Sequence, residues 1–263
     1  MEITLLGTGA ADGWPNPFCR CASCAQARDA DEHRSPASAL VDGCLLLDAG
    51  PSLGPQAAAS GVDLAAVGTI LLTHAHHDHL DPSFLLYRSW VSDAPLVVAG
   101  PRPAIERCRP WLAPDQTVVE FVELTAGDVA TWGRHRVTAL PARHEAFGEA
   151  LLYAVESPGG ALLYATDTGP WVDRAATLLA GRRFDLVVME ETFGDRDDLG
   201  DEHLGLATFA AEVDRLRLRG CVEDATQVVA THLSHHNPPL PLLRRRLRDI
   251  GADVVPDGTT LWS

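Results

Sequence analysis

The sequence of 263 residues lacks any apolar run long enough to cross a membrane as a helix. Such a helix needs about 20 consecutive apolar residues, so no membrane-spanning segment and no membrane partner are expected. Residues 1–7 also lack the basic and the long apolar regions of a secretory signal peptide. These absences predict a cytoplasmic protein.

Positive charge is also scarce. The 21 Lys and Arg residues stand against 36 Asp and Glu residues, which gives a formal net charge of −15 at pH 7. A surface of this sign repels polyanions, so the composition argues against a large nucleic-acid partner. A small phosphorylated substrate is not excluded, because a metal ion or a few arginines can reverse the potential locally.

Linkers and low-complexity tracts are absent too. No Gly/Ser-rich stretch divides the chain, so the sequence predicts a single domain over residues 1–263. Hydrophobic residues make up 46% of the chain, which is enough for a core without disulfides. In a reducing compartment the six cysteines are therefore expected to be free thiols or metal ligands.

Short apolar runs bounded by turn residues predict many strands, with helices alternating among them in the second half. The predicted strands are residues 2–7, 39–41, 44–48, 69–73, 96–99, 118–124, 136–140, 151–156, 161–165, 185–189 and 227–231. The predicted helices are residues 82–90, 104–112, 172–179, 206–218 and 241–250. Residues 157–160 predict a hairpin turn, and residues 14–36 an irregular Cys-rich loop. This mixture favours two packed sheets with helices outside.

The densest group of polar residues is His74-Ala75-His76-His77-Asp78-His79, directly after the predicted strand 69–73. Alternate side chains of an extended loop point the same way, so His74 and His76 can reach one metal ion together. Asp78 and His79, where the loop turns into the next helix, can reach a second ion. A solvated polar loop is the alternative, and it does not explain so many ligand residues after a buried strand.

Two ions need more ligands than this loop supplies, and His144, Asp167 and His232 each follow a later predicted strand. Asp167 has two carboxylate oxygens and can bridge two cations that lie a few ångströms apart. Each of the three residues alone would more readily be a cap or a surface side chain. Together they complete two sites.

These residues together resemble the pattern of the metallo-β-lactamase superfamily over nearly the whole chain. The resemblance implies an α/β fold, an αββα four-layer sandwich, with a dinuclear metal site at one edge. It implies that one ion is bound by His74, His76 and His144, the other by Asp78, His79 and His232, and that Asp167 bridges them. Such ligands accept Mn²⁺ and Zn²⁺ alike, so the sequence leaves the catalytic metal open.

Three cysteines, Cys19, Cys21 and Cys24, have the spacing C-x-C-x-x-C within the Cys-rich loop. In a reducing compartment this spacing predicts three thiolate ligands of one structural Zn²⁺, which prefers four tetrahedral ligands. His235, three residues after His232, is the candidate for the fourth ligand. The alternative is three free cysteines in a loop.

The glycine-rich turn at residues 7–13, the cysteine motif and the pair His232 and His235 resemble the PhnP-like phosphodiesterases. They are similar, more distantly, to PqqB-type proteins of quinone cofactor biosynthesis. His203, just before the predicted helix 206–218, resembles the histidine that phosphodiesterase members, ribonuclease Z included, place opposite the metals. That likeness implies a general acid, because an alkoxide leaves poorly unless it is protonated. The alternative is a surface histidine at a helix start.

Three further assignments complete the predicted site. Asp48, the last residue of the predicted strand 44–48, is expected to orient a histidine ligand through a hydrogen bond. Arg143, beside His144, is a candidate for holding a substrate phosphate, with ordinary surface charge as the alternative. Asp78 counts among the catalytic residues as well as the ligands.

The leading hypothesis is a dinuclear metal-dependent phosphodiesterase that acts on a small phosphodiester or a cyclic phosphate. Two divalent cations would neutralise the phosphoryl oxygens and activate water, and His203 would protonate the leaving oxygen. Two alternatives stay open: an acyl hydrolase acting on a lactone or thioester, and a non-catalytic accessory protein similar to PqqB. The oligomeric state is open as well, with a homodimer as one option.

Overall fold

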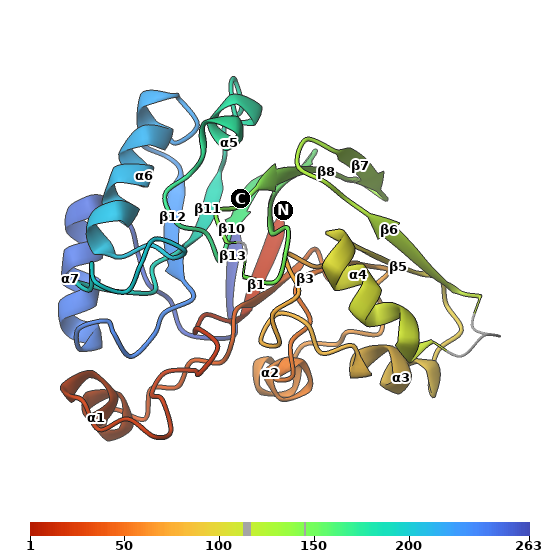
Figure 1. Cartoon of the computed structure of the whole chain (residues 1–263), viewed down its shortest axis with the longest axis horizontal. Helices are drawn as coiled ribbons and strands as arrows, with labels where there is room; N and C mark the ends of the chain where they lie inside the picture. Colours follow the sequence, from red (N-terminus) through yellow and green to blue (C-terminus); the bar gives the residue numbers. More distant parts are fainter. Residues whose placement is uncertain (113–116, 145) are drawn as a thin grey trace.

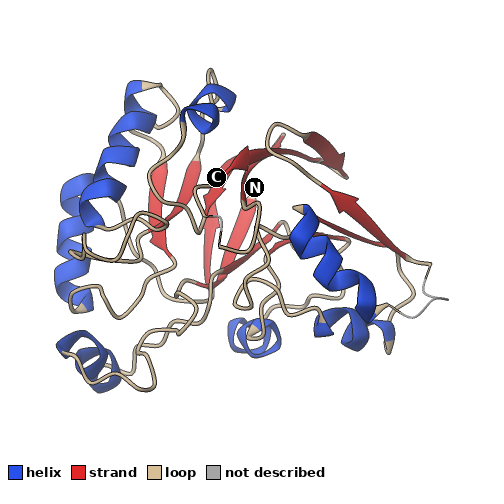
Figure 2. Cartoon of the chain, viewed as in Figure 1, coloured by secondary structure: helices blue, strands red, loops and turns tan. Residues whose placement is uncertain are grey.

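Two mixed β-sheets lie at the centre of the computed structural model, which describes residues 1–112, 117–144 and 146–263. Figure 1 follows the chain from its N-terminus to its C-terminus, and Figure 2 shows the strands between two groups of helices. Among the described residues, no helix combines the length and the apolar character needed to cross a membrane.

The first sheet has seven strands and contains the N-terminal half of the fold. In spatial order they are β13 (Thr259–Trp262), β1 (Glu2–Gly7), β2 (Ser38–Val41), β3 (Leu45–Leu47), β4 (Thr69–Leu71), β5 (Leu96–Gly100) and β6 (Val119–Glu123). The strands from β3 to β6 run parallel, so their carboxyl ends lie at one edge of the sheet. The C-terminal strand β13 pairs antiparallel with β1.

The second sheet has six strands. In spatial order they are β12 (Gln227–Thr231), β11 (Leu186–Glu190), β10 (Gly160–Ala165), β9 (Leu151–Ser157), β8 (His135–Pro141) and β7 (Val129–Trp132). Strands β10, β11 and β12 are parallel to one another, and the others are antiparallel. Ser157 pairs with Gly160, which confirms the predicted hairpin turn at residues 157–160.

Helices cover the outer face of each sheet (Figure 1). The first sheet is covered by α2 (Leu53–Ser60), α3 (Ser83–Ser89) and α4 (Arg102–Cys108), and the second by α1 (Ala22–Asp29), α5 (Asp173–Leu178), α6 (Leu206–Leu218) and α7 (Leu240–Ile250). The layers are therefore helix, sheet, sheet and helix, which confirms the predicted four-layer sandwich.

The alternation of side chains along a strand explains why both faces of the sheets are buried. In β9, Leu151, Tyr153 and Val155 belong to the core between the two sheets, whereas Leu152 and Ala154 belong to the core beneath the second group of helices. Successive side chains of a strand point to opposite faces, so an unbroken apolar run serves two cores at once.

Two local predictions are wrong. Residues 14–36 are not irregular throughout, because α1 begins at Ala22, where the Cys21 side chain caps it by accepting a hydrogen bond from Cys24 N. The predicted helix 104–112 ends as an α-helix at Cys108 and continues as a 3₁₀ turn over Arg109–Trp111. Pro110 lacks the N–H that would continue the α-helix.

Candidate metal centre

The side chains predicted to bind the catalytic metals lie together in two groups, each with ligand atoms within 4.8 Å of one another. The first group is His74, His76, His144 and Asp167, and the second is Asp78, His79, Asp167 and His232. Asp167 belongs to both groups, which is the position a bridging carboxylate needs. The two groups have the members that the resemblance implies for the two metal sites, and metal binding by them stays a prediction.

Each group draws two side chains from each sheet. The loop after β4 carries His74, His76, Asp78 and His79, and the strands of the second sheet are followed by the remaining three residues. His144 follows β8, Asp167 follows β10 and His232 follows β12. The centre therefore lies where the strand ends of the two sheets meet, on a rigid scaffold.

Three residues at these strand ends have left-handed backbone conformations. The φ angle is 60° at Asp48, 55° at Asp167 and 53° at His232. Residues other than glycine rarely adopt such angles, and strained positions of this kind are concentrated at functional sites. The backbone thus indicates a function at this edge independently of the side chains.

Four of the five candidate histidine ligands are oriented by hydrogen bonds at Nδ1; the exception is His76, whose Nδ1 lies 3.0 Å from His144 Nε2. The partners are Thr73 Oγ1 for His74 at 3.0 Å, Asp48 Oδ2 for His79 at 2.7 Å, Glu202 O for His144 at 3.2 Å and Thr192 Oγ1 for His232 at 2.9 Å. A proton on Nδ1 leaves the Nε2 lone pair free for a metal ion. Within the described residues, Nε2 of His74, His79 and His232 is buried and has no hydrogen-bond partner.

The spacing of these atoms fits shared metal ions. His79 Nε2 lies 3.0 Å from Asp78 Oδ2 and 2.8 Å from Asp167 Oδ2, although it makes no hydrogen bond with either oxygen. Ligands bound at about 2.0–2.1 Å around one tetrahedral ion lie about 3.3 Å apart. Close approach without hydrogen-bond geometry is what two ligands of the same ion show. The donor set therefore fits divalent cations.

The protonation of His74 and Asp167 suits metal binding. Burial and the neighbouring imidazoles hold the pKa of His74 well below its usual value, so this side chain is neutral. Burial alone would raise the pKa of Asp167, but His232, His79 and His74 surround it and hold its pKa well below the usual range. Neutral imidazole and ionised carboxylate are the forms that bind metals. At His79 burial lowers the pKa, but the nearby carboxylates outweigh it and raise the pKa well above its usual value, so this ring must lose a proton when it binds a metal ion.

Asp48 lies where the sequence argument expected it, against a candidate ligand. It is buried, and besides its bond to His79 it accepts hydrogen bonds from Thr73 N at 2.8 Å and Thr73 Oγ1 at 2.9 Å. These contacts hold the carboxylate in one orientation. Asp48 can therefore fix both the position and the tautomer of the His79 ring.

His203 lies beside the two groups and belongs to neither, but it forms a further group with Glu190 and His232, whose ligand atoms also lie within 4.8 Å of one another. Its ring stacks on His232 with centroids 5.3 Å apart and an angle of 12°, and its centroid is 4.7 Å from that of His144. Burial alone would lower the pKa of His203, but the Glu190 carboxylate, 3.0 Å from Nδ1, raises it to about 9. His203 is thus charged at neutral pH and keeps Nε2 for another contact.

Glu190 is the functional candidate that the sequence analysis missed. It ends β11 and is buried, and Thr168 N, Thr192 Oγ1 and Leu204 N all donate to its carboxylate. A signal was available, since this acidic residue ends a strand that lies between the strands preceding Asp167 and His232.

Arg143 and two aromatic rings border the centre. The Arg143 guanidinium forms an ion pair with Asp201, and its predicted contact with a substrate phosphate stays a prediction. Phe147 is 63% exposed and packs edge-on against His76 at 4.6 Å, whereas Phe193 lies 5.2 Å from His203. The rings give the polar centre an apolar border.

The sulfur atoms of Cys19, Cys21 and Cys24 also form a group within 4.8 Å, as the motif requires. Cys21 N donates to Cys19 Sγ and Cys24 N donates to Cys21 Sγ, both at 3.4 Å. His235 lies beside them, with its carbonyl 3.7 Å from Cys21 Sγ, but its imidazole is outside the group and Nδ1 bonds Asp12 at 2.9 Å. The structural Zn²⁺ site, with His235 as fourth ligand, stays a prediction.

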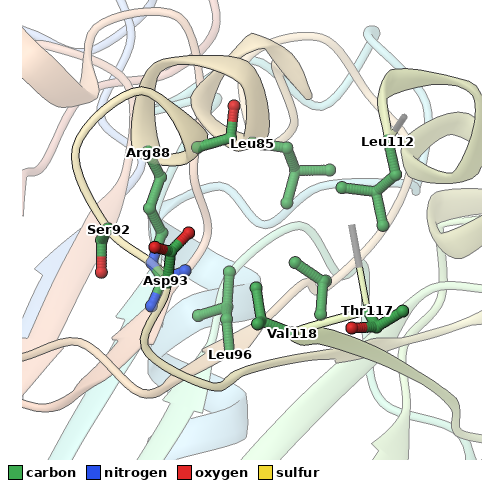
Figure 3. A pocket seen from close by; sticks show the side chains of 10 residues that line it. Leu85, Arg88, Ser92, Asp93, Leu96, Leu112, Thr117 and Val118 are labelled. Atoms are coloured by element: carbon green, nitrogen blue, oxygen red, sulfur yellow. The ribbon is translucent and has the colours of Figure 1, made fainter. Parts of the chain in front are cut away.

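A cavity of about 280 Å³ lies away from these groups, between α3, β5 and the start of β6 (Figure 3). It is lined by Leu85, Arg88, Ser89, Ser92, Asp93, Leu96, Leu112, Thr117, Val118 and Val119. None of the candidate metal ligands is among these residues. The cavity and the metal centre are therefore separate sites, and only the metal centre has a set of candidate metal ligands.

Comparisons with known proteins agree with this geometry. The model of a beta-lactamase superfamily domain matches residues 44–233. Ribonuclease Z of Mycobacterium bovis is 32% identical over 208 residues, which are 69% of this chain and 67% of that protein.

Two solved structures superpose on nearly the whole chain. A diphosphatase from the PhnP family has a TM-score of 0.77 at 22% identity and covers 100% of this chain and 97% of its own. Zn²⁺-bound PqqB from Methylobacterium extorquens has a TM-score of 0.75 at 21% identity and covers 99% of each chain. At these identities the two structures establish a shared fold.

Proposed function

Because the chain belongs to the metallo-β-lactamase superfamily, we propose that its metal centre makes it a dinuclear phosphodiesterase that acts on a small phosphodiester or cyclic phosphate. The observation that supports this proposal most is the position of His203. It lies beside both ligand groups, completes neither, and is oriented by Glu190. A group so placed suits protonation of a leaving oxygen.

The chain's own residues divide the work. The seven side chains of the two ligand groups would hold the cations, and Asp48 orients one of them through His79. When bound, two divalent cations would draw charge from the phosphoryl oxygens and supply a nucleophile from water at neutral pH. Mn²⁺ and Zn²⁺ both suit this mixture of imidazole and carboxylate.

His203 would act as the general acid. Its Nδ1 is held by Glu190, so the proton to be donated is on Nε2. A protonated imidazole near the reacting atoms can give this proton to the alkoxide as the P–O bond breaks. Phe193 packs against the ring and limits its movement.

The small size of the substrate is supported by charge. A net charge of −15 opposes a long polyanion, whereas one phosphodiester needs only the local field of the centre. The likeness to ribonuclease Z favours RNA as a second candidate. The cytoplasmic location expected from the sequence stays a prediction, and a homodimer stays one option for the oligomeric state.

Substrate screening of the purified protein, loaded with Mn²⁺ or Zn²⁺, tests the proposal. Bis-p-nitrophenyl phosphate and a panel of cyclic phosphates are expected to be hydrolysed faster than a chromogenic β-lactam, a thioester or a short RNA. Preference for the lactam or thioester would establish an acyl hydrolase instead. Preference for the RNA would favour the second candidate, and no metal-dependent turnover at all would favour an accessory protein.

Replacement of Cys21 tests the structural metal separately. The ligand groups predict three ions per chain, two catalytic and one bound by the cysteines. Cys21→Ser should lose the third ion and unfold at lower temperature, because the binding energy of such a site is folding energy. Each kcal/mol lost lowers Tm by about 2–4 °C in a chain of this size.

Elemental analysis and thermal unfolding measure both effects. Cys44→Ser is the matched control, since Cys44 lies outside the cysteine group and should keep all three ions. Unchanged zinc content and unchanged Tm in Cys21→Ser would show that the cysteines bind no structural Zn²⁺.

A further inference from the structure

His203 is carried by the segment between β11 and α6, and this segment forms neither helix nor strand over residues 191–205. Without the hydrogen bonds of regular structure, a side chain is placed only as well as the contacts that hold its backbone. The contacts just before His203 therefore decide how well its imidazole is positioned.

Arg143 and His144, in the loop after β8, contact Asp201 and Glu202, in the segment that carries His203. The Arg143 guanidinium forms an ion pair with the Asp201 carboxylate, and His144 Nδ1 donates to Glu202 O at 3.2 Å. The next residue in the chain is His203, whose ring lies against that of His144. The placement of His203 thus follows directly from the placement of Asp201 and Glu202.

The loop that carries Arg143 is itself anchored. Arg143 N donates to Thr168 Oγ1 at 3.0 Å, and Gly169 N donates to Arg143 O at 3.0 Å. Both partners follow Asp167, the shared residue of the two ligand groups. Arg143 is therefore fixed to the metal centre at its backbone and reaches across to Asp201 with its side chain.

Gly169 shows how tightly the His203 segment approaches. A Cβ atom added at Gly169 would lie 1.7 Å from Asp201 O and 3.4 Å from Arg143 Cδ. Only glycine leaves room for the Asp201 backbone at this point. The segment is thus pressed against Gly169 and held there from the side by Arg143.

We propose that the Arg143–Asp201 ion pair positions His203 for proton transfer, so that Arg143 is a positioning residue and not a phosphate ligand. The inference rests on the proposed function insofar as it concerns proton transfer. The two side chains are 45% and 62% exposed, so the pair contributes little to global stability. Its effect is local, on the segment before His203.

The two roles for Arg143 predict opposite behaviour for its partner. If Arg143 bound the substrate phosphate, Asp201→Ala would free the guanidinium, and KM would stay the same or fall. If the ion pair positions His203, Asp201→Ala and Arg143→Ala remove the same constraint. The two variants should then be alike, and the double variant should be no worse than either.

Amide hydrogen exchange, read by mass spectrometry on peptides that span residues 196–205, tests the pair without any substrate. Arg143→Ala and Asp201→Ala should both speed exchange in these peptides with an unchanged Tm, and the double variant should add nothing further. Gly169→Ala, which displaces Asp201 without removing a charge, should have the same effect. Exchanging the two residues, Arg143→Asp with Asp201→Arg, should restore slow exchange.

Arg136→Ala is the matched control, because Arg136 forms an ion pair of similar exposure with Glu156 on β8 and β9. It should leave exchange in residues 196–205 unchanged. In kinetic measurements, Arg143→Ala and Asp201→Ala should each lower kcat on an alkyl phosphodiester by about 10- to 100-fold, because small misplacements of reacting groups cost this much in rate. They should lose much less on a p-nitrophenyl ester, with KM unchanged on both.

Each contrary result overturns the inference in a different way. A raised KM in Arg143→Ala with a normal Asp201→Ala would make Arg143 a phosphate ligand. Additive effects in the double variant, or slow exchange in all variants, would show that the pair does not hold the segment. Equal kinetic losses on both esters would separate the pair from proton transfer. If no phosphodiester is hydrolysed, the proposed function fails, while the exchange result still decides the role of the pair.

Discussion

Asp167→Ala is expected to lose measurable turnover together with both catalytic metal ions. Asp167 is the one residue that the two ligand groups share, and it lies 2.8 Å from His79 Nε2 and 3.4 Å from His232 Nε2. Its loss leaves the first group with imidazoles alone and the second with Asp78 as its single carboxylate, which is too little negative charge for two divalent cations. Metal content measured by elemental analysis and turnover of a phosphodiester should fall together.

The backbone of Asp167 calls for a second variant. Its φ angle of 55° suits Asp or Asn better than Ala, so Asp167→Ala adds strain to the loss of charge. Asp167→Asn keeps the conformation and should lose the metals and the activity as well. Asp173→Ala, at an exposed aspartate that begins α5, is the control and should behave like the parent protein. Two bound ions and substantial activity in Asp167→Asn would contradict a bridging role.

His203→Ala is expected to keep both metals and to lose about 10²–10⁴-fold in kcat on an alkyl phosphodiester, which is the contribution of general acid catalysis. His203 shares a further group with Glu190 and His232, but the seven ligands of the two catalytic groups are complete without it, so we expect both ions to stay bound. The alkoxide needs its proton to leave. A p-nitrophenolate leaves without one, so the loss on a p-nitrophenyl ester should be much smaller.

Steady-state kinetics on both substrates, with metal content measured in parallel, decide this point. His33→Ala is a suitable control, because His33 is an exposed surface histidine paired with Asp31. Small and equal losses on both esters would remove His203 from the mechanism and would return the acyl hydrolase to consideration. Loss of metal in His203→Ala would make it a ligand.

The candidate ligands could be predicted because they lie in loops that follow apolar strands, where the chain must leave the core. His74, Asp167 and His232 are all of this kind, and parallel strands bring their ends to one edge. Glu190 stands in the same kind of position and was missed, because a single acidic residue has no spacing pattern to identify it. The Arg143–Asp201 pair joins residues 58 positions apart, so no local pattern contains it.

The layers of the fold were predicted from the sequence, but several short helices and strands were not. The sequence of α2, Leu53–Ser60, contains a glycine and a proline, which are typical of loops. Strand β13 is half exposed and has its place only because Trp262 pairs with Glu2 at the other end of the chain. Both depend on tertiary contacts, whereas the long apolar strands are evident from local sequence.

The division of the metal groups between the two sheets has a consequence for assembly of the protein. Neither sheet alone carries a complete group, since each group takes two side chains from the loop after β4 and two from the second sheet. We therefore expect the proposed cations to bind tightly only after the two sheets have docked, and to link the two sheets once they are bound. On this basis metal uptake should come late in maturation, and the free energy of binding should add to the association of the sheets.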